Sequence, residues 1–304
     1  MQQQPNNKNS QDLTGKTAVV TGGNVGLSFQ SALELAESGA HVVIACRSVE
    51  KGETAMARIR LKVSSASLEV IPLDLTDRDS IHQFAQVFSS KHDRLDILLS
   101  NAGVVNLKEL ARTKEGWEMH IATNHLGHFL LTGLLFETLV ATPDARVVTV
   151  SSGAYKAAKM NFDDLHWENR PYARIGSYAE SKLANLLFMS ALQRRFDAAG
   201  SSAKSMSAHP GLAATERQQS IGIGGWLSRV MARPVSFGAR PQMMAATAPD
   251  LPACSFLGPR FGMWGSPSPI KLSGLAIDEK VQEKLWVISE KLTEFQYPKA
   301  TENA

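Results

Sequence analysis

The sequence has few cysteines, little excess charge and no long hydrophobic run. Its 304 residues carry a formal net charge of only +3, which gives no compositional support for nucleic-acid binding. Cys46 and Cys254 lie far apart without metal-ligand neighbours, so we expect unpaired thiols in a reducing, cytoplasmic compartment. The longest apolar stretch, Leu126–Val140, contains His128 and Glu137 and is shorter than the about 20 residues of a membrane span.

The N-terminal segment also lacks apolar residues. Met1–Gln11 is rich in Gln and Asn and has no apolar core of the kind found in a secretory signal, which predicts a flexible tail over residues 1–12. The hydrophobic content of 43% is enough for a large core. We therefore expect residues 13–304 to form a single domain.

Short β-branched segments alternate with longer amphipathic ones along the chain. Strands rich in Val and Ile without strict alternation suit a parallel sheet that is buried on both faces. The pattern predicts an α/β fold with a Rossmann-type doubly wound parallel sheet and helices on both faces. The predicted strands are Thr17–Thr21, His41–Arg47, Leu68–Leu73, Leu95–Ser100, Arg146–Val150 and Lys204–Ala208. The predicted helices are Val25–Ser38, Glu50–Val63, Arg78–Lys91, Glu115–Val140, Ser177–Ala198 and Asp278–Phe295.

The region Leu212–Gly274 differs from the rest because it contains many Gly and Pro residues and few acids. Apolar and methionine side chains can line an adaptable ligand site, so we expect a mobile lid over a mainly apolar substrate pocket. The alternative is that these side chains pack as ordinary core helices. The side chains in question are Ile221, Ile223, Trp226, Leu227, Val230, Met231, Met243 and Met244.

A glycine-rich turn, Thr21–Ser28 (TGGNVGLS), follows the first predicted strand and opens the first predicted helix. Gly22 and Gly26 would let the backbone approach a pyrophosphate, and the helix N-terminus supplies N–H donors. Asn24 and Leu27 belong to the same predicted cofactor turn. The alternative is a tight turn that binds no ligand.

The end of the second strand has no acidic residue, although NAD-selective sites usually place one there to bind the ribose 2′-hydroxyl. Arg47 stands at this point and Lys51 one helical turn later, where both could pair with a 2′-phosphate. These residues favour NADP(H) as the cofactor. The alternative is that both are ordinary solvated cations.

Two further strand ends carry candidate adenosine contacts. Asp74, followed by Leu75, could accept a hydrogen bond from an adenine amino group, or it could be a turn residue of the N-cap kind. Asn101, Ala102 and Gly103 follow the fourth strand and would let the chain pass close to the adenine ribose. The alternative for these three is a plain turn at the end of the strand.

The most informative pattern is Tyr178 followed four residues later by Lys182, with Ser151 and Ser152 upstream. Residues four apart on a helix share a face. An adjacent ammonium stabilises a phenolate and lowers the tyrosine pKa from its usual value near about 10. The pair therefore predicts an acid/base device, and with the glycine turn it indicates hydride transfer to or from a nicotinamide. The alternative is a surface tyrosine.

Over roughly Thr14–Thr215 the sequence resembles the short-chain dehydrogenase/reductase family, with seven motifs in its order and approximate spacing. The motifs are TGxxxGxx, Asp74-Leu75, Asn101-Ala102-Gly103, Asn124, Ser151-Ser152, Tyr178-x-x-x-Lys182 and Pro210-Gly211. The phrases ACRSVEKGE, TNHLGHFLLT and SKLANLLF are similar to the branch that holds retinol dehydrogenases, WW-domain oxidoreductases and, more remotely, protochlorophyllide reductases.

The resemblance implies a role for each matching residue. Tyr178 would donate the proton in reduction and accept it in oxidation, and Lys182 would bind the nicotinamide ribose and lower the pKa of Tyr178. Ser152 would hold the substrate oxygen, and Asn124 would support a water relay behind the lysine. The residues lining the nicotinamide would be Pro210, Gly211 and Thr215. The nearby histidines, His125, His128 and His209, form no metal-ligand set, so we expect structural roles for them and no metal site.

The sequence departs from the family pattern at the third glycine of the turn, which is Ser28, and at Ser100-Asn101, where many members have two asparagines. We expect Ser28 to cause a local adjustment without loss of binding, because serine is small. The membrane-anchoring N-terminal helix of several retinol dehydrogenases has no counterpart in the printed sequence, which weakens the transfer of a retinoid substrate.

These observations predict an NADP(H)-dependent oxidoreductase that acts on a hydrophobic ketone, aldehyde or secondary alcohol of specialised metabolism. One alternative is a non-catalytic NADP(H)-binding sensor or interaction protein, because a fold alone does not fix function. Another is a specialised C=C reductase that uses the same tyrosine and lysine. Family members often pair through two helices, here Glu115–Val140 and Ser177–Ala198, so a homodimer or homotetramer is a further expectation.

Overall fold

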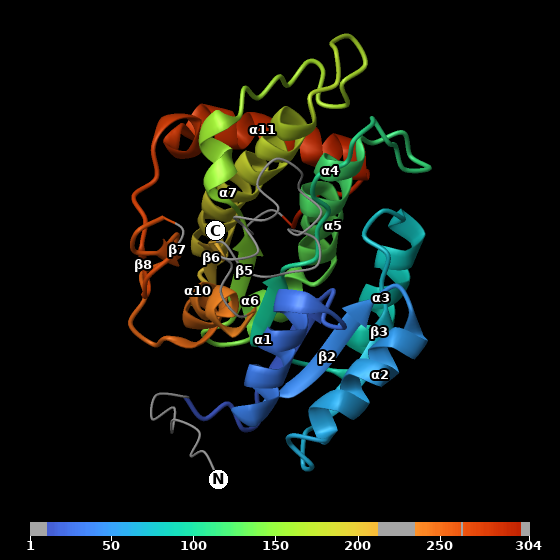
Figure 1. Cartoon of the computed structure of the whole chain (residues 1–304), viewed down its shortest axis with the longest axis vertical. Helices are drawn as coiled ribbons and strands as arrows, with labels where there is room; N and C mark the ends of the chain where they lie inside the picture. The colour runs from blue at the N-terminus through green and yellow to red at the C-terminus, as the bar shows by residue number, and fades with distance from the viewer. Residues whose placement is uncertain (1–10, 212–234, 263, 299–304) are drawn as a thin grey trace, which may run out of the picture.

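The β-branched segments form one central sheet in the computed structural model, which describes residues 11–211, 235–262 and 264–298 (Figure 1). The strand order is β3-β2-β1-β4-β5-β6-β7-β8, and all neighbouring strands are parallel except β7 and β8. The strands are β1 (Thr17–Thr21), β2 (His41–Cys46), β3 (Leu68–Pro72), β4 (Ile97–Ser100), β5 (Arg146–Val150), β6 (Lys204–Ala208), β7 (Phe256–Pro259) and β8 (Pro267–Pro269). The predicted doubly wound parallel sheet is confirmed, with two further strands at one edge.

Helices cover both faces of this sheet. One face carries α1 (Gly26–Glu37), α2 (Val49–Arg60) and α10 (Val235–Thr247). The other carries α3 (Arg78–Lys91), α5 (Gly127–Leu134) and α7 (Arg174–Ala198), and α11 (Glu279–Thr293) packs against α7. The shorter segments are α4 (Met119–Ile121), the π-helical η1 (Ala122–Leu126), α6 (Phe136–Ala141), and the 3-10 helices η2 (Gly153–Ala157) and η3 (Gly274–Ile277).

The alternation of side chains along each strand explains why the strands are apolar throughout. Val19 packs into a cluster with Phe129 and Phe188, whereas Val20 packs into the opposite cluster with Leu33. Successive strand residues point to opposite faces, and here both faces are buried. A parallel sheet covered on both sides therefore needs apolar residues at every position.

The chain order reverses between β1 and β4, which are neighbours in the sheet. Thr21, the last residue of β1, joins the two strand ends because its Oγ accepts hydrogen bonds from the backbone N–H groups of Asn101 (3.0 Å) and Ala102 (2.9 Å). In open α/β sheets, ligands bind outside the carboxyl ends of the strands at such a reversal. This edge is therefore the place to look for the site.

The prediction of one continuous helix over Glu115–Val140 is wrong. The structure has several shorter helical segments there, and the first begins later than predicted. α4 begins at Met119, because the side chain of Glu118 accepts a hydrogen bond from the Ile121 N–H (2.8 Å) and caps the helix there. The π-helical turn Ala122–Leu126 follows, and a break separates α5 from α6. Single π-helical turns inside helices are frequent at functional sites.

The expected mobile lid over Leu212–Gly274 stays a prediction, and the described part of that region includes a helix that packs on the sheet. α10 packs against α1, and the side chain of Gln242 donates to the Ser31 hydroxyl (2.6 Å). Met243 is buried in the core and Met244 packs against it, so the alternative of ordinary core packing holds for both. The remaining apolar residues of the expected lid lie outside the described residues, namely Ile221, Ile223, Trp226, Leu227, Val230 and Met231.

The helices expected to pair with a second copy are covered within the chain itself. α11 packs on α7 and α5, and Trp286 of α11 lies against Phe188 (ring centroids 5.9 Å apart) and Phe129 (4.9 Å). Pairing with a second copy through these helices stays a prediction. None of the helices in the described segments combines the length and apolarity needed to cross a membrane.

Candidate active site

The glycine-rich turn connects β1 to the start of α1. Gly22 has a φ of 68°, in the left-handed region, and a Cβ added there would lie 3.2 Å from the Cβ of Ala102. Gly26, the first residue of α1, also has a positive φ of 62°. Val25, the N-cap residue, provides no side-chain hydrogen bond to the first turn of the helix, whose N–H groups can therefore bind an anion. Asn24 and Leu27 lie in the same segment, half-buried.

Ser28, where the family has a third glycine, is buried and makes a specific contact. Its hydroxyl oxygen accepts a hydrogen bond from the side-chain amide of Asn101, which follows β4. The serine thus links the start of α1 to the β4 turn. The expected local adjustment takes the form of this hydrogen bond.

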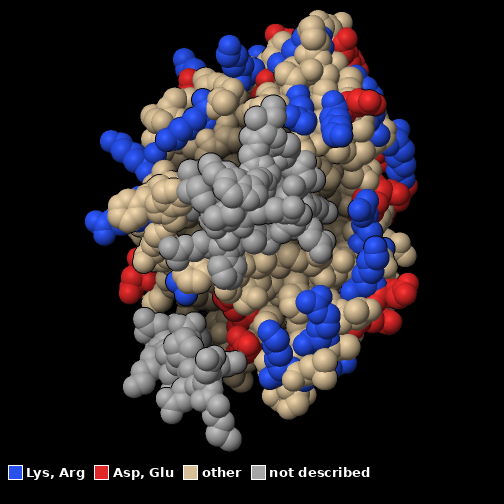
Figure 2. All heavy atoms as spheres, viewed as in Figure 1, with Lys and Arg blue, Asp and Glu red and all other residues tan. Residues whose placement is uncertain are grey.

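Arg47 and Lys51 are both exposed at the junction of β2 and α2. Ser48 caps α2 by accepting a hydrogen bond from the Lys51 N–H (3.2 Å). Cys46, the residue before Arg47, is buried, and burial raises the pKa of its thiol. Basic side chains gather in the region of α2 (Figure 2). Positions 45–48 thus contain Arg47 and no carboxylate, and Lys51 follows in the first turn of α2.

Asp74 shapes the turn after β3. Its Oδ1 accepts hydrogen bonds from both the backbone N–H (2.9 Å) and the hydroxyl (2.7 Å) of Thr76, as a turn residue of the N-cap kind would. Leu75 is buried against α5, where a Cβ added at Gly127 would clash with its carbonyl oxygen. Asp74 and Leu75 are thus fixed after β3, the first by the turn and the second by its contact with α5.

Asn124 lies in the π-helical turn and is nearly fully buried. Its Oδ1 accepts a hydrogen bond from the Val104 N–H (2.8 Å), and its Nδ2 donates to the Val104 carbonyl (3.1 Å) and to the Ser181 hydroxyl (2.9 Å). It therefore ties the segment after β4 to α7. A Cβ added at Gly103 would lie 2.7 Å from this Oδ1 and 3.8 Å from Lys182 Nζ, so the β4 turn also approaches the lysine.

Tyr178 and Ser152 meet between α7 and the end of β5. The two side chains are hydrogen-bonded, and this bond opposes the effect of burial on the pKa of Tyr178. Burial dominates, so the pKa of Tyr178 lies above its usual value of 10.0. The neighbouring Ser151 instead donates its hydroxyl to the Lys182 carbonyl (2.7 Å), which leaves Ser152 as the serine at the tyrosine.

Lys182 is buried on the same face of α7, with its Nζ 5.6 Å from the centre of the Tyr178 ring. The Nζ donates to the Val150 carbonyl (2.9 Å), and burial lowers the pKa of Lys182 to about 8. The expectation that the ammonium lowers the pKa of Tyr178 is not met by this geometry. The reason is that burial has the largest effect on this pKa, and the contribution that opposes it comes from the Ser152 hydrogen bond.

Three histidines lie near these residues. His125 and His128 are fully buried, and burial lowers the pKa of His125 to about 3 and of His128 to about 4. His128 Nε2 lies 2.9 Å from the Thr21 hydroxyl, and His125 Nε2 lies 2.8 Å from that of Ser289. Burial also lowers the pKa of His209. Their hydrogen bonds are internal, as expected for structural histidines.

The turn after β6 completes the described part of the site. Pro210 is half-buried and Gly211 has a φ of 69°, with its N–H 3.4 Å from His209 Nδ1. His209 itself is held to β7 by a hydrogen bond from its N–H to the Leu257 carbonyl (2.7 Å). Thr215, the remaining predicted nicotinamide contact, lies outside the described residues.

A buried polar group behind Tyr178 was not predicted from the sequence. His120 lies with its ring 5.8 Å from that of Tyr178, and its Nδ1 is 3.0 Å from both Glu118 Oε1 and the Ser177 hydroxyl. Both Glu118 and His120 are almost fully buried. Their spacing of two residues indicates no shared helix face, so no periodic pattern could have identified the pair.

The fold thus brings together the residues predicted for chemistry. Ser152, Tyr178, Lys182 and Asn124 come from three different elements and meet beside the carboxyl ends of β4 and β5. The glycine turn and Arg47 lie along the same edge of the sheet, at the ends of β1 and β2. A hydroxyl pair, a buried ammonium and an anion-binding turn at one edge can support proton transfer next to a bound dinucleotide.

Comparison with known proteins agrees with this geometry. The family model described as short chain dehydrogenase matches residues 16–224. Retinol dehydrogenase 13 from Homo sapiens is 36% identical over 302 residues, which cover 95% of this chain and 88% of that protein. Retinol dehydrogenase 12 from Homo sapiens is 39% identical over 284 residues, which cover 91% and 86% respectively.

A solved structure is also similar over nearly the whole chain. The crystal structure of an uncharacterized protein from Mycobacterium paratuberculosis is 40% identical, with a TM-score of 0.82 and coverage of 95% of this chain and 97% of that one. The match therefore includes the elements beyond residue 224, among them the last two strands and α11.

Proposed function

The chain belongs to the short-chain dehydrogenase family, and we propose that it is an NADP(H)-dependent oxidoreductase acting on a hydrophobic ketone, aldehyde or secondary alcohol. The observation that carries the proposal is the meeting of Tyr178, Ser152 and Lys182 at the end of β5. A binding protein without chemistry would not need a hydrogen-bonded tyrosine and serine next to a buried lysine.

The residues at the β1–α1 turn fit a dinucleotide. Gly22 leaves free the space that a Cβ would fill, and the first turn of α1 has no side-chain cap. Arg47 and Lys51 would hold the 2′-phosphate, which supports NADP(H) over NAD(H). Asp74 has a second carboxylate oxygen for the adenine amino group. The bound cofactor would supply or accept the hydride.

Tyr178 moves the proton in this proposal. In reduction its hydroxyl donates a proton to the substrate oxygen, and in oxidation it takes that proton back. Ser152 hydrogen-bonds Tyr178 and would hold the same substrate oxygen. The raised pKa keeps the phenol protonated at neutral pH, which is the form required for reduction.

Lys182 and Asn124 position this acid. Lys182 would bind the nicotinamide ribose, and its ammonium lies on the same helix face as the phenol. Asn124 holds the helix that carries both, through its hydrogen bond to Ser181. A water relay through Asn124 would return the proton to solvent.

Apolar side chains near the site support a hydrophobic substrate. Ile175, one helical turn before Tyr178 on α7, exposes 67% of its surface, and Phe261, in the turn between β7 and β8, exposes 68%. Gly262 next to Phe261 hydrogen-bonds His209 at the end of β6, which brings that turn to the site. The relatives named retinol dehydrogenases make retinal and retinol reasonable members of a substrate panel.

The test is a panel of hydrophobic aldehydes, ketones, alcohols and enones with NADPH, NADH and their oxidised forms. We expect turnover of carbonyl or alcohol substrates with the phosphorylated cofactor, and loss of that turnover in Tyr178→Phe. Cofactor binding without turnover of any substrate would favour a sensor. Reduction of enones alone would favour a C=C reductase.

A further inference from the structure

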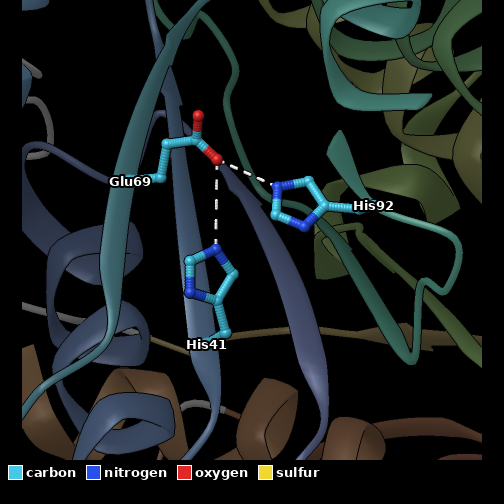
Figure 3. A group of neighbouring side chains, drawn as sticks. All are labelled: His41, Glu69 and His92. Atoms are coloured by element: carbon cyan, nitrogen blue, oxygen red, sulfur yellow. Dashed lines mark hydrogen bonds and ion pairs between the residues drawn. The ribbon is translucent and has the colours of Figure 1, made fainter. Parts of the chain in front are cut away.

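His41, Glu69 and His92 meet at the edge of the sheet opposite to the proposed active site (Figure 3). His41 is the first residue of β2, Glu69 lies near the start of β3, and His92 is the C-cap residue of α3. These positions are at the amino ends of the parallel strands, whereas the glycine turn lies at their carboxyl ends. The cluster therefore has no part in the chemistry proposed above.

The two imidazoles direct their Nε2 atoms toward the same carboxylate oxygen (Figure 3). His92 Nε2 lies 2.9 Å and His41 Nε2 lies 4.0 Å from Glu69 Oε2, and the two rings are 5.1 Å apart. One ligand atom from each residue falls within 4.8 Å of the others. His41 Nε2 is buried and has no hydrogen-bond partner among the described residues. A buried nitrogen without a partner is costly unless something binds it.

Neighbouring residues fix these three side chains from outside. The Ser67 hydroxyl lies 2.7 Å from His41 Nδ1, so the other ring nitrogen of His41 is the one turned toward Glu69. Lys91 donates to Glu69 Oε1, which leaves Oε2 facing the imidazoles. Metal-bound histidines almost always make a second hydrogen bond of this kind through the ring nitrogen that does not bind the ion.

We propose that His41, Glu69 and His92 bind one divalent transition-metal ion, with Zn²⁺ the best match. Two imidazole nitrogens and one carboxylate oxygen are ligands that Zn²⁺ accepts, and water would complete the tetrahedron. Zinc–ligand bonds of about 2.0–2.1 Å place tetrahedral ligand atoms roughly 3.3 Å apart. Glu69 Oε2 lies 2.9 Å from His92 Nε2 and 4.0 Å from His41 Nε2, on either side of that value. Small side-chain movements would therefore form the site.

The ion would join β2, β3 and the end of α3, three segments that are distant in sequence. It would therefore stabilise the folded chain without touching substrate or cofactor. The three ligands follow no sequence motif, because the pairing of β2 with β3 and the packing of α3 bring them together. The sequence therefore carries no signal for this site.

The test uses untagged full-length protein freed of metal with a chelator. Isothermal titration with Zn²⁺ should show one ion per chain, and thermal unfolding should show a higher Tm with Zn²⁺. His41→Gln and His92→Gln should each weaken binding by at least tenfold and remove the Tm increase. Ser67→Ala, which leaves all ligands in place, should weaken binding by about 10–100-fold. Co²⁺ titration gives a second measure, because tetrahedral coordination produces a characteristic visible spectrum.

The matched control is His82→Gln, which removes an exposed histidine from the same helix α3. It should bind Zn²⁺ as the native protein does. The proposal is overturned if the native chain binds no Zn²⁺, or if His41→Gln and His82→Gln bind it equally. Turnover at the distant active site is measured in parallel and should not depend on Zn²⁺, so failure of one proposal leaves the other standing.

Discussion

A Cβ atom placed on Gly103 would lie 2.7 Å from the side-chain oxygen of Asn124, closer than real Cβ contacts allow. Gly103 is required here for space, since its φ is not among the positive values. The Asn124 amide cannot easily move aside, because it bonds Val104 on one side and Ser181 on the other. The β4 turn and the Asn124 amide therefore depend on each other.

We predict that Gly103→Ala lowers both stability and turnover. The methyl group would displace the Asn124 amide and strain the β4 turn, at a cost of about 1–3 kcal/mol. Thermal unfolding and kcat with the best substrate measure the two effects. Gly153→Ala is the control, since a Cβ there meets only His209 Nε2 at 3.5 Å, an ordinary contact. Equal behaviour of the two variants would contradict the argument.

Tyr178→Phe should reduce kcat by about 10²–10⁴-fold while cofactor affinity is retained. The substitution removes the hydroxyl that Ser152 bonds and keeps the ring that packs beside His120. Tyr155→Phe is the matched control, because its buried hydroxyl has no hydrogen-bond partner in the described structure. Steady-state kinetics and cofactor titration check both variants. Native rates in Tyr178→Phe would refute the assigned role.

Arg47→Ala should weaken NADPH binding and leave NADH binding nearly unchanged. A charge-assisted hydrogen bond contributes roughly 1.5–3 kcal/mol, so we expect a loss of about one to two orders of magnitude in affinity. Fluorescence titration of each reduced cofactor measures the ratio. Arg60→Ala, at the exposed far end of α2, is the control and should change neither affinity. Tighter binding of NADH by the native protein would overturn the proposed preference.

The sequence predicted the six parallel strands because their β-branched residues must fill two buried faces. It missed β7 and β8, whose short sequences Phe256–Pro259 and Pro267–Pro269 contain proline or glycine and look like loops. Proline is tolerated in strands at the edge of a sheet, which is where β8 lies. The helix α10 was not predicted for a similar reason, because Pro241 lies inside it and proline usually breaks a helix.

The sequence predicted site residues that lie close together along one helix. It did not predict contacts between residues on different elements. Tyr178 and Lys182 share a helix face, so their spacing alone placed them together. His120 reaches Tyr178 only because α4 packs on α7, and no periodicity indicates that contact. Burial is also invisible in a sequence, which is why the predicted direction of the pKa of Tyr178 did not match the structure.

Lys182→Met should stabilise the protein at neutral pH while it abolishes turnover. Burial lowers the pKa of Lys182 from 10.5 to about 8, so carrying the charged form into the fold costs on the order of 3 kcal/mol below pH 8. Methionine has a similar length and no charge. The Val150 carbonyl would keep one partner, because Asn185 Nδ2 also donates to it (3.0 Å).

The sign of the pH dependence follows from the lowered pKa. Between about pH 8 and 10.5 the unfolded chain holds more protons on this lysine than the folded one, so the native protein gains stability as the pH rises through that window. The Tm advantage of Lys182→Met should therefore be largest below pH 8 and should vanish above about pH 10.5. Thermal unfolding without cofactor, recorded across this range for both proteins, measures the difference. A Met variant less stable than the native protein at neutral pH, or a difference that does not change with pH, would contradict the assigned burial cost.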